Sequence, residues 1–173
     1  MDNFAVADAL AAMSILADTR EQDTARARLR LKQIGFPVQR VALPFGDYSA
    51  VCPALDLRDK VAIERKMHID ELAHCYCQDR PRFVREFERA KAAGAKLYLL
   101  IEDGNVDDIY AGRYRTKTSP NALSASLFAW LARYDCQLIF CAAQNSGRVI
   151  HDVLYREMKE RLENMEGNRN ADV

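Results

Sequence analysis

The sequence predicts one α/β domain built of three layers, with helices on both faces of a central β-sheet. Short apolar runs alternate with helical patterns along almost the whole chain of 173 residues, which is typical of this class of fold. Residues 97–101 and 138–142 are almost entirely apolar, as strands buried on both faces are expected to be. A chain of this length can bury one sizeable core but not two.

The first half of the chain is expected to contain three strands and one helix. Gly35 and Pro37 end the helical pattern, and Gly46 lies in a turn that leads into the second strand. In chain order, the predicted elements are a strand at 14–17, a helix at 22–34, an extended segment at 38–43, a strand from 46–48 onward and a strand at 61–65.

The second half is expected to contribute four helices and two strands. Gly94 ends one helix, and Ser119 followed by Pro120 marks the start of another. The predicted elements are helices at 68–77 and 82–93, a strand at 97–101, a helix from 120 to 134, a strand at 138–142 and a final helix at 147–163. Residues 1–163 therefore form the predicted domain, and the polar residues 164–173 a flexible tail.

Charge and cysteine content restrict the class of protein. Twenty-five basic residues balance twenty-five acidic ones, so any basic surface for nucleic acid must be local. No apolar run approaches the ~20 residues that cross a bilayer, and the N-terminus lacks the basic start of a signal peptide. Five cysteines without framework spacing indicate reduced thiols. We therefore expect a cytoplasmic protein without a membrane segment.

One pattern carries chemical information: Gly46-Asp47-Tyr48, followed further along by Glu64-Arg65-Lys66. Residues two apart on a strand share a face, so Glu64 and Lys66 point together and Arg65 points to the other side. If the strand after Asp47 lies beside them, two carboxylates and an ammonium converge. The alternative interpretation is a turn dipeptide and an ordinary exposed ion pair.

Such a trio suits metal-assisted hydrolysis of a phosphodiester. Mg²⁺ prefers oxygen ligands, usually one or two carboxylates with water and phosphate oxygens. A bound metal acidifies a water molecule and offsets charge on the reacting phosphate. A nearby lysine can orient or deprotonate that water, and the carbonyl of Arg65 can add a ligand.

Further acidic residues flank this pattern. Asp18 and Glu21 follow the first predicted strand, and active-site residues gather at the carboxyl ends of strands. They also fit a capping box for the next helix. Asp70 falls four residues after Lys66, in the first helical turn, where we expect it to face back toward the strand end. It also fits a carboxylate that stabilises a helix N-terminus.

Taken together, these motifs resemble the nuclease domain of the XPF family of structure-specific DNA endonucleases, whose signature is GD followed by ERK, three residues and D. The resemblance covers residues 14–143 and includes the strand at 97–101 that leads to acidic residues. It implies the restriction-endonuclease-like form of the three-layer α/β fold, with a central mixed β-sheet flanked by helices.

The resemblance also implies a reaction: Mg²⁺- or Mn²⁺-dependent cleavage of branched, flapped or nicked duplex DNA. Repair, recombination and phage DNA processing are all open as its pathway. The metal ligands would be Asp47, Glu64 and the carbonyl of Arg65. Lys66 would be the catalytic lysine. The supporting acidic positions would be Asp18, Glu21 and Asp70.

Most cellular members of that family carry a helix-hairpin-helix module after the nuclease domain, and we expect none in this chain. It is similar to compact stand-alone forms of bacteria and phages, which would act at the nucleoid. DNA is the expected partner, together with a second copy of the chain or a separate DNA-binding protein.

Two clusters of basic residues are candidate DNA contacts. Arg82, Arg85 and Arg89 share one face of a predicted helix, although Glu86 also fits a solvated helix face there. A second cluster, in a predicted loop that also contains two tyrosines, consists of Arg113, Arg115 and Lys117.

Two other functions compete with this one. A catalytically inactive DNA-binding or scaffold relative is expected to lose the GD or ERK residues, which are all present here. An unrelated nucleotide-binding enzyme is disfavoured because no glycine-rich phosphate loop occurs.

Overall fold

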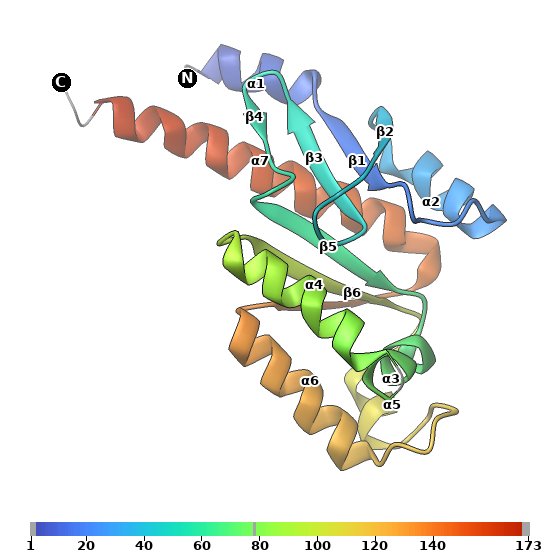
Figure 1. Cartoon of the computed structure of the whole chain (residues 1–173). Coiled ribbons are helices and arrows are strands. Elements are labelled where there is room, and N and C mark those ends of the chain that lie inside the picture. Colours follow the sequence, from blue (N-terminus) through green and yellow to red (C-terminus); the bar gives the residue numbers. More distant parts are fainter. Residues whose placement is uncertain (1–2, 78, 171–173) are drawn as a thin grey trace.

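A mixed β-sheet forms the middle layer of the structure, and helices cover both of its faces (Figure 1). The computed structural model describes residues 3–77 and 79–170. In this part of the chain the sheet has seven strands in the order β2-β1-β3-β5-β6-β7, with β4 paired to β3. The strands are β1 (Ser14–Asp18), β2 (Val38–Val41), β3 (Tyr48–Cys52), β4 (Leu55–Asp56), β5 (Val61–Lys66), β6 (Lys96–Glu102) and β7 (Gln137–Cys141).

The direction of β3 brings several chain segments to one edge of the sheet. β1 runs parallel to β2, and β5, β6 and β7 run parallel to one another, whereas β3 is antiparallel to β1 and β5. The start of β3 therefore lies beside the ends of β1 and β5. Two backbone hydrogen bonds of 2.8 Å fix this register: Asp18 donates to the carbonyl of Asp47, and Asp47 donates to that of Ile63.

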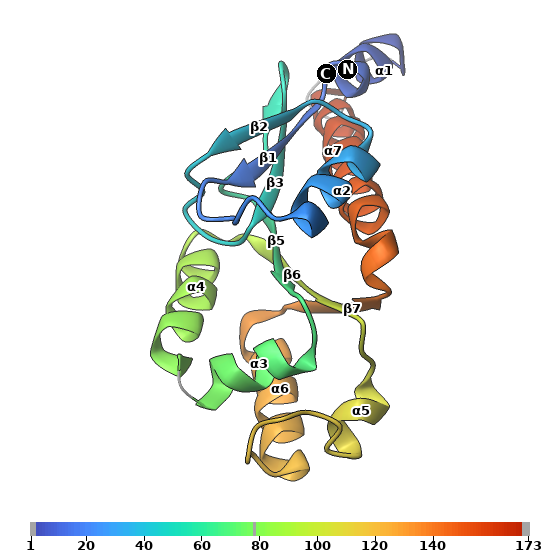
Figure 2. The ribbon, with the colours of Figure 1, turned by 90° about the vertical axis from the view of Figure 1, so that its right-hand side faces the viewer.

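Helices pack on the two faces of the sheet as separate groups (Figure 2). On one face lie α1 (Asn3–Ala11), α2 (Ala25–Ile34) and α7 (Ser146–Asn170), and on the other lie α3 (Ile69–Cys77), α4 (Arg80–Ala92), α5 (Val106–Tyr110) and α6 (Pro120–Tyr134). The first core is centred on Ile15, Tyr48 and Leu154, all fully buried. The second contains Phe87 and Trp130. Within the described residues, no helix combines the length and apolar character that crossing a bilayer requires.

Most predicted elements are present, with shifted ends. Thr24 caps α2 by accepting the N–H of Ala27 at 3.0 Å, so this helix starts after residue 24 and not at 22, and the capping box predicted at residues 18–22 does not form. Ser119 caps α6 as predicted. The extended segment at 38–43 contributes β2, which pairs with β1.

Several elements were not predicted from the sequence. They are α1, the two-residue strand β4, the single-turn helix α5 and the 3-10 helix at Ala143–Asn145. α1 is stabilised by packing against α7. α7 continues to Asn170, past the predicted end at residue 163. Residues 171–173 of the predicted tail lie outside the described residues, and its flexibility stays a prediction.

Candidate active site

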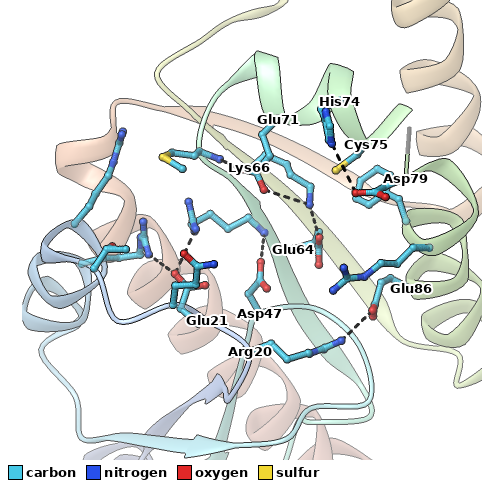
Figure 3. Close-up of a pocket in the computed structure, with 18 residues that line it drawn as sticks. Arg20, Glu21, Asp47, Glu64, Lys66, Glu71, His74, Cys75, Asp79 and Glu86 are labelled. Atoms are coloured by element: carbon cyan, nitrogen blue, oxygen red, sulfur yellow. Dashed lines mark hydrogen bonds and ion pairs between the residues drawn. The ribbon is translucent and has the colours of Figure 1, made fainter. Parts of the chain in front are cut away.

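A cavity of about 550 Å³ lies at the sheet edge where β1, β3 and β5 meet, and α3 and α4 form its far wall (Figure 3). Four of the six residues predicted to be catalytic line it, and so does Arg65. These four are Glu21, Asp47, Glu64 and Lys66. Segments far apart in the chain therefore bring the predicted residues into one space.

Gly46 allows the backbone before β3 to run close to β5. Its φ is +70°, and a Cβ at this position would lie 2.8 Å from the Cβ of Ala62 and 3.2 Å from the carbonyl oxygen of Ile63. This close approach lets Oδ2 of Asp47 accept the N–H of Arg65 at 2.8 Å. The Asp47 carboxylate is thereby held against β5, beside Glu64.

Glu64 and Lys66 share a face of β5, as the strand alternation predicts. Nζ of Lys66 lies 2.8 Å from Oε1 of Glu64, and both residues are buried. The same ammonium lies 3.7 Å from Oε1 of Glu71 and 4.7 Å from the centre of the Phe83 ring. Glu71 was not predicted from the sequence; its position in the first turn after Lys66 was the available signal.

The charges of this group depend on one another. Burial raises the pKa of Asp47 well above its ordinary value, and the neighbouring charge of Glu64 raises it further. Burial by itself would lower the pKa of Lys66, but the charge and hydrogen bond of Glu64 outweigh it and raise that pKa above its ordinary value. Lys66 is therefore an ammonium ion, and the two carboxylates favour a further positive charge.

The oxygen donors at this point suit a hard divalent cation. In the described part of the chain, no three His, Cys, Asp or Glu side chains are grouped to hold a metal ion. Asp47 and Glu64 both line the cavity, and their carboxylates are close enough for their charges to interact. Mg²⁺ is commonly held by one or two carboxylates and otherwise by water, so these residues fit Mg²⁺ or Mn²⁺.

A second group of charges lies on the α2 side of β5. Oε1 of Glu21 accepts from Nη1 of Arg30 at 2.7 Å and from Nη2 of Arg65 at 3.3 Å. Glu102, at the end of β6, lies 3.1 Å from Nε of Arg30 and 3.5 Å from Nη1 of Arg65. Arg30 also donates to the hydroxyls of Tyr48 and Ser146. Arg26 lies 3.4 Å from Glu102 as well. Two glutamates thus pair with three arginines on this side of the cavity.

Sequence analysis missed the part that Arg30 plays in this group. It is one of several basic residues spread around α2, and no pattern along that helix separates it from the others. Glu102, in contrast, ends a continuous apolar run, which was a recognisable signal.

Asp18 lies outside the cavity lining, although it was predicted as a catalytic residue. Its Oδ1 accepts Nε of Arg20 at 2.6 Å and the N–H of the same residue at 2.7 Å, and its Oδ2 accepts the N–H of Leu43 at 2.8 Å. Burial opposes ionisation, but these hydrogen bonds lower the pKa of Asp18 below its ordinary value. Its carboxylate orients Arg20, whose Nη1 reaches Glu86 on α4 at 3.2 Å.

Asp70 also lies outside the cavity lining. We predicted that its side chain would face the end of β5, and this prediction was wrong. Its Oδ1 accepts the N–H of Arg115 at 2.6 Å, and its Oδ2 lies 3.6 Å from Nε of the same residue. The carboxylate therefore contacts the segment between α5 and α6.

The predicted DNA contacts fall into two groups. Arg82 lines the cavity, whereas Arg85 is exposed on α4 outside it. Glu86 on the same helix pairs with Arg20 and Arg89, so this face is mixed in charge. The other group is exposed between α5 and α6 and consists of Arg113, Arg115 and Lys117.

Comparisons with known proteins assign the chain to a family. The ERCC4 domain matches residues 17–153, and no curated protein matches the chain. Among solved structures, XPF from Aeropyrum pernix is similar with 22% identity and a TM-score of 0.63, covering 89% of this chain and 69% of that chain. A structure of the same protein in complex with DNA is similar with 21% identity and a TM-score of 0.61, covering 86% of this chain and 66% of that chain. With the XPF-type restriction-endonuclease-like fold and a family match over most of its length, this chain belongs to the ERCC4 domain family.

Proposed function

We propose that this protein is a divalent-metal-dependent DNA endonuclease that cleaves branched, flapped or nicked duplex DNA. The observation that carries the proposal is the convergence of Asp47, Glu64 and Lys66 in one cavity, with none of the motif residues substituted. Membership of the ERCC4 domain family and the similarity to an XPF that was solved with DNA support it.

Asp47, Glu64 and the carbonyl of Arg65 would hold Mg²⁺ or Mn²⁺. When bound, such an ion lowers the pKa of a coordinated water and offsets charge on the phosphate. The fold itself supplies the fixed carboxylates: Asp47 is anchored by the N–H of Arg65, and Glu64 is anchored by Lys66.

Lys66 contributes a buried positive charge at the reacting phosphate. Its ammonium already hydrogen-bonds Glu64, so a water or phosphate oxygen beside that carboxylate lies within its reach. A preorganised donor in a partly dry site stabilises negative charge that develops during hydrolysis. Glu71, 3.7 Å from the same nitrogen, helps to hold this side chain in place.

Other residues hold these groups or contact DNA. Glu21 lines the cavity while two arginines fix its carboxylate, and Asp18 positions Arg20 at the cavity mouth. DNA phosphates would be contacted from two sides of the cavity by Arg82, Arg85, Arg113, Arg115 and Lys117. A second copy of the chain or a separate DNA-binding partner would extend this surface.

A cleavage assay on labelled DNA tests the proposal. Single strand, duplex, flap, fork and four-way junction are incubated with Mg²⁺, Mn²⁺ or chelator. We expect metal-dependent cutting of branched DNA, lost in Glu64→Gln and retained in Glu160→Gln, a change at an exposed position on α7. Binding without cutting on every substrate would overturn the proposal in favour of an inactive DNA-binding relative.

A further inference from the structure

Asp70 has a structural partner that its place in the motif does not suggest. It follows Lys66 by four residues, yet its carboxylate contacts Arg115, 45 positions further along the chain. The hydrogen bond from the N–H of Arg115 is 2.6 Å long, and the Nε of that residue lies 3.6 Å from the second carboxylate oxygen. Asp70 thus joins the end of β5, the strand that carries Glu64 and Lys66, to the basic loop. By the basic loop we mean residues 111–119 between α5 and α6.

α3 separates the cavity from the basic loop. Glu71, His74 and Cys75 line the cavity from one side of this helix (Figure 3). From its two ends, Asp70 and Cys77 contact the basic loop, the latter through Thr118. Because α3 begins three residues after Lys66, movement of this helix would shift the basic loop and the end of β5 together.

The basic loop is folded, and its cations point outward. Arg113 donates from its backbone and from Nε to Asp108, at 2.9 and 2.6 Å, and the hydroxyl of Tyr114 donates to the carbonyl of Thr118 at 2.9 Å. The side chain of Arg115 is 93% exposed. Its backbone, in contrast, is fixed by Asp70.

We propose that Asp70 is a positioning residue, which holds the basic loop against α3 and so sets the distance between Lys66 and the DNA phosphates that the loop contacts. This inference rests on the proposed function. An α-helix with its side chains is about 10 Å across, and a DNA strand advances ~3.4 Å per nucleotide. The loop therefore contacts phosphates a few nucleotides away from the cleaved bond.

The first measurement concerns the loop itself and needs no DNA. Hydrogen exchange of the Arg115 amide is followed in the wild type, in Asp70→Ala and in Asp107→Ala, which removes an exposed carboxylate from the first turn of α5. We expect exchange at least about tenfold faster in Asp70→Ala, because a charge-assisted hydrogen bond is lost, and no change in Asp107→Ala. Asp70→Asn retains an acceptor and should keep most of the protection.

The second measurement separates positioning from chemistry. On a labelled flap, Asp70→Ala should raise KM about tenfold, change kcat less than about threefold and spread the cuts over neighbouring bonds, while Mn²⁺ binding without DNA is unchanged. The double variant Arg115→Ala, Lys117→Ala should bind DNA more weakly than the wild type. Adding Asp70→Ala to it should weaken DNA binding little further, because all three substitutions act through the basic loop.

Unchanged exchange of the Arg115 amide would overturn the proposal. A loss of Mn²⁺ binding, or a fall in kcat of a hundredfold or more at saturating DNA, would overturn it as well and make Asp70 part of the catalytic centre. If the wild type cuts no DNA, the proposed function fails. The inference about Asp70 is still tested in that case, because amide exchange and DNA affinity decide whether Asp70 holds the loop.

Discussion

Nη1 of Arg30 lies 2.7 Å from Oε1 of Glu21, and both side chains are almost completely buried. The first residue belongs to α2 and the second to the segment between β1 and that helix, so the pair fixes the helix against the cavity wall. Arg30 also neutralises Glu102 at 3.1 Å. Without it, Glu21 would keep Arg65 as its ion-pair partner, and Glu102 would keep Arg65 and the more exposed Arg26.

We therefore expect Arg30→Met to lower the free energy of unfolding by about 3–5 kcal/mol, because it removes the most buried of the positive charges that compensate the carboxylates of Glu21 and Glu102. Urea denaturation measures this loss. Arg28→Met on the same helix serves as the control; its ion pair with Asp23 is exposed, and its effect should stay within ~0.5 kcal/mol. Equal losses in the two variants would refute the assigned role of Arg30.

Asp47→Asn should stabilise the metal-free protein at neutral pH. Burial and the charge of Glu64 raise the pKa of Asp47, so the folded state binds this proton more tightly than the unfolded state. The stability that Asp47 contributes is thus full below its ordinary pKa of 3.8 and is lost as the pH rises through its higher folded pKa.

Thermal unfolding from pH 4 to 8 measures this effect. The Tm of Asp47→Asn should exceed that of the wild type at pH 7, and the difference should shrink toward pH 4. Asp23→Asn, at an exposed site, should show no such trend. Mg²⁺ should raise the Tm of the wild type and not that of Asp47→Asn. A wild type more stable than Asp47→Asn at pH 7 would contradict the raised pKa.

Gly46→Ala should be more harmful than Gly94→Ala. Both glycines have positive φ, +70° and +65°, so each alanine costs about 1–2 kcal/mol of conformational energy. Only at Gly46 would the new Cβ meet other atoms, 2.8 Å from that of Ala62, whereas Gly94 has open space within 4 Å. For Gly46→Ala alone, we expect a further ~1–3 kcal/mol of destabilisation and a loss of DNA cleavage. Denaturation measures the first effect and the flap assay the second.

Lys66→Met should lower kcat by about 10²- to 10⁴-fold, the range typical of a positioned proton-transfer or charge-stabilising group. Lys60→Met is the matched control, because Lys60 is exposed just before β5 while Lys66 ends that strand. Circular dichroism establishes that both variants are folded. Cleavage by Lys66→Met at the wild-type rate would remove this lysine from the mechanism.

The local part of the site was predictable because strand geometry is periodic. Alternation along β5 places Glu64 and Lys66 on one face and Arg65 on the other, whatever surrounds them, and the observed 2.8 Å pair follows from it. The turn before β3 was predictable from Gly46, because glycine readily adopts positive φ. The apolar runs of β6 and β7 similarly indicated buried strands.

The long-range partners were not predictable in this way. Asp18 and Asp70 have the residue type and the spacing of catalytic carboxylates. The carboxylate of Asp18, however, accepts hydrogen bonds from Arg20 and Leu43, and that of Asp70 accepts one from Arg115. These contacts depend on how a loop folds back on a strand or a helix, which no local pattern encodes.

By itself, the sequence determined the fold class, most of its elements and the shared strand face of Glu64 and Lys66, because each depends on periodicity or on backbone preference within a short segment. Only the tertiary structure decided which charges pair with Glu21 and Glu102 and which carboxylates lie outside the cavity lining. Arg30 meets Glu102 across 72 positions of sequence, and such a pairing is set by the packing of α2 against the sheet.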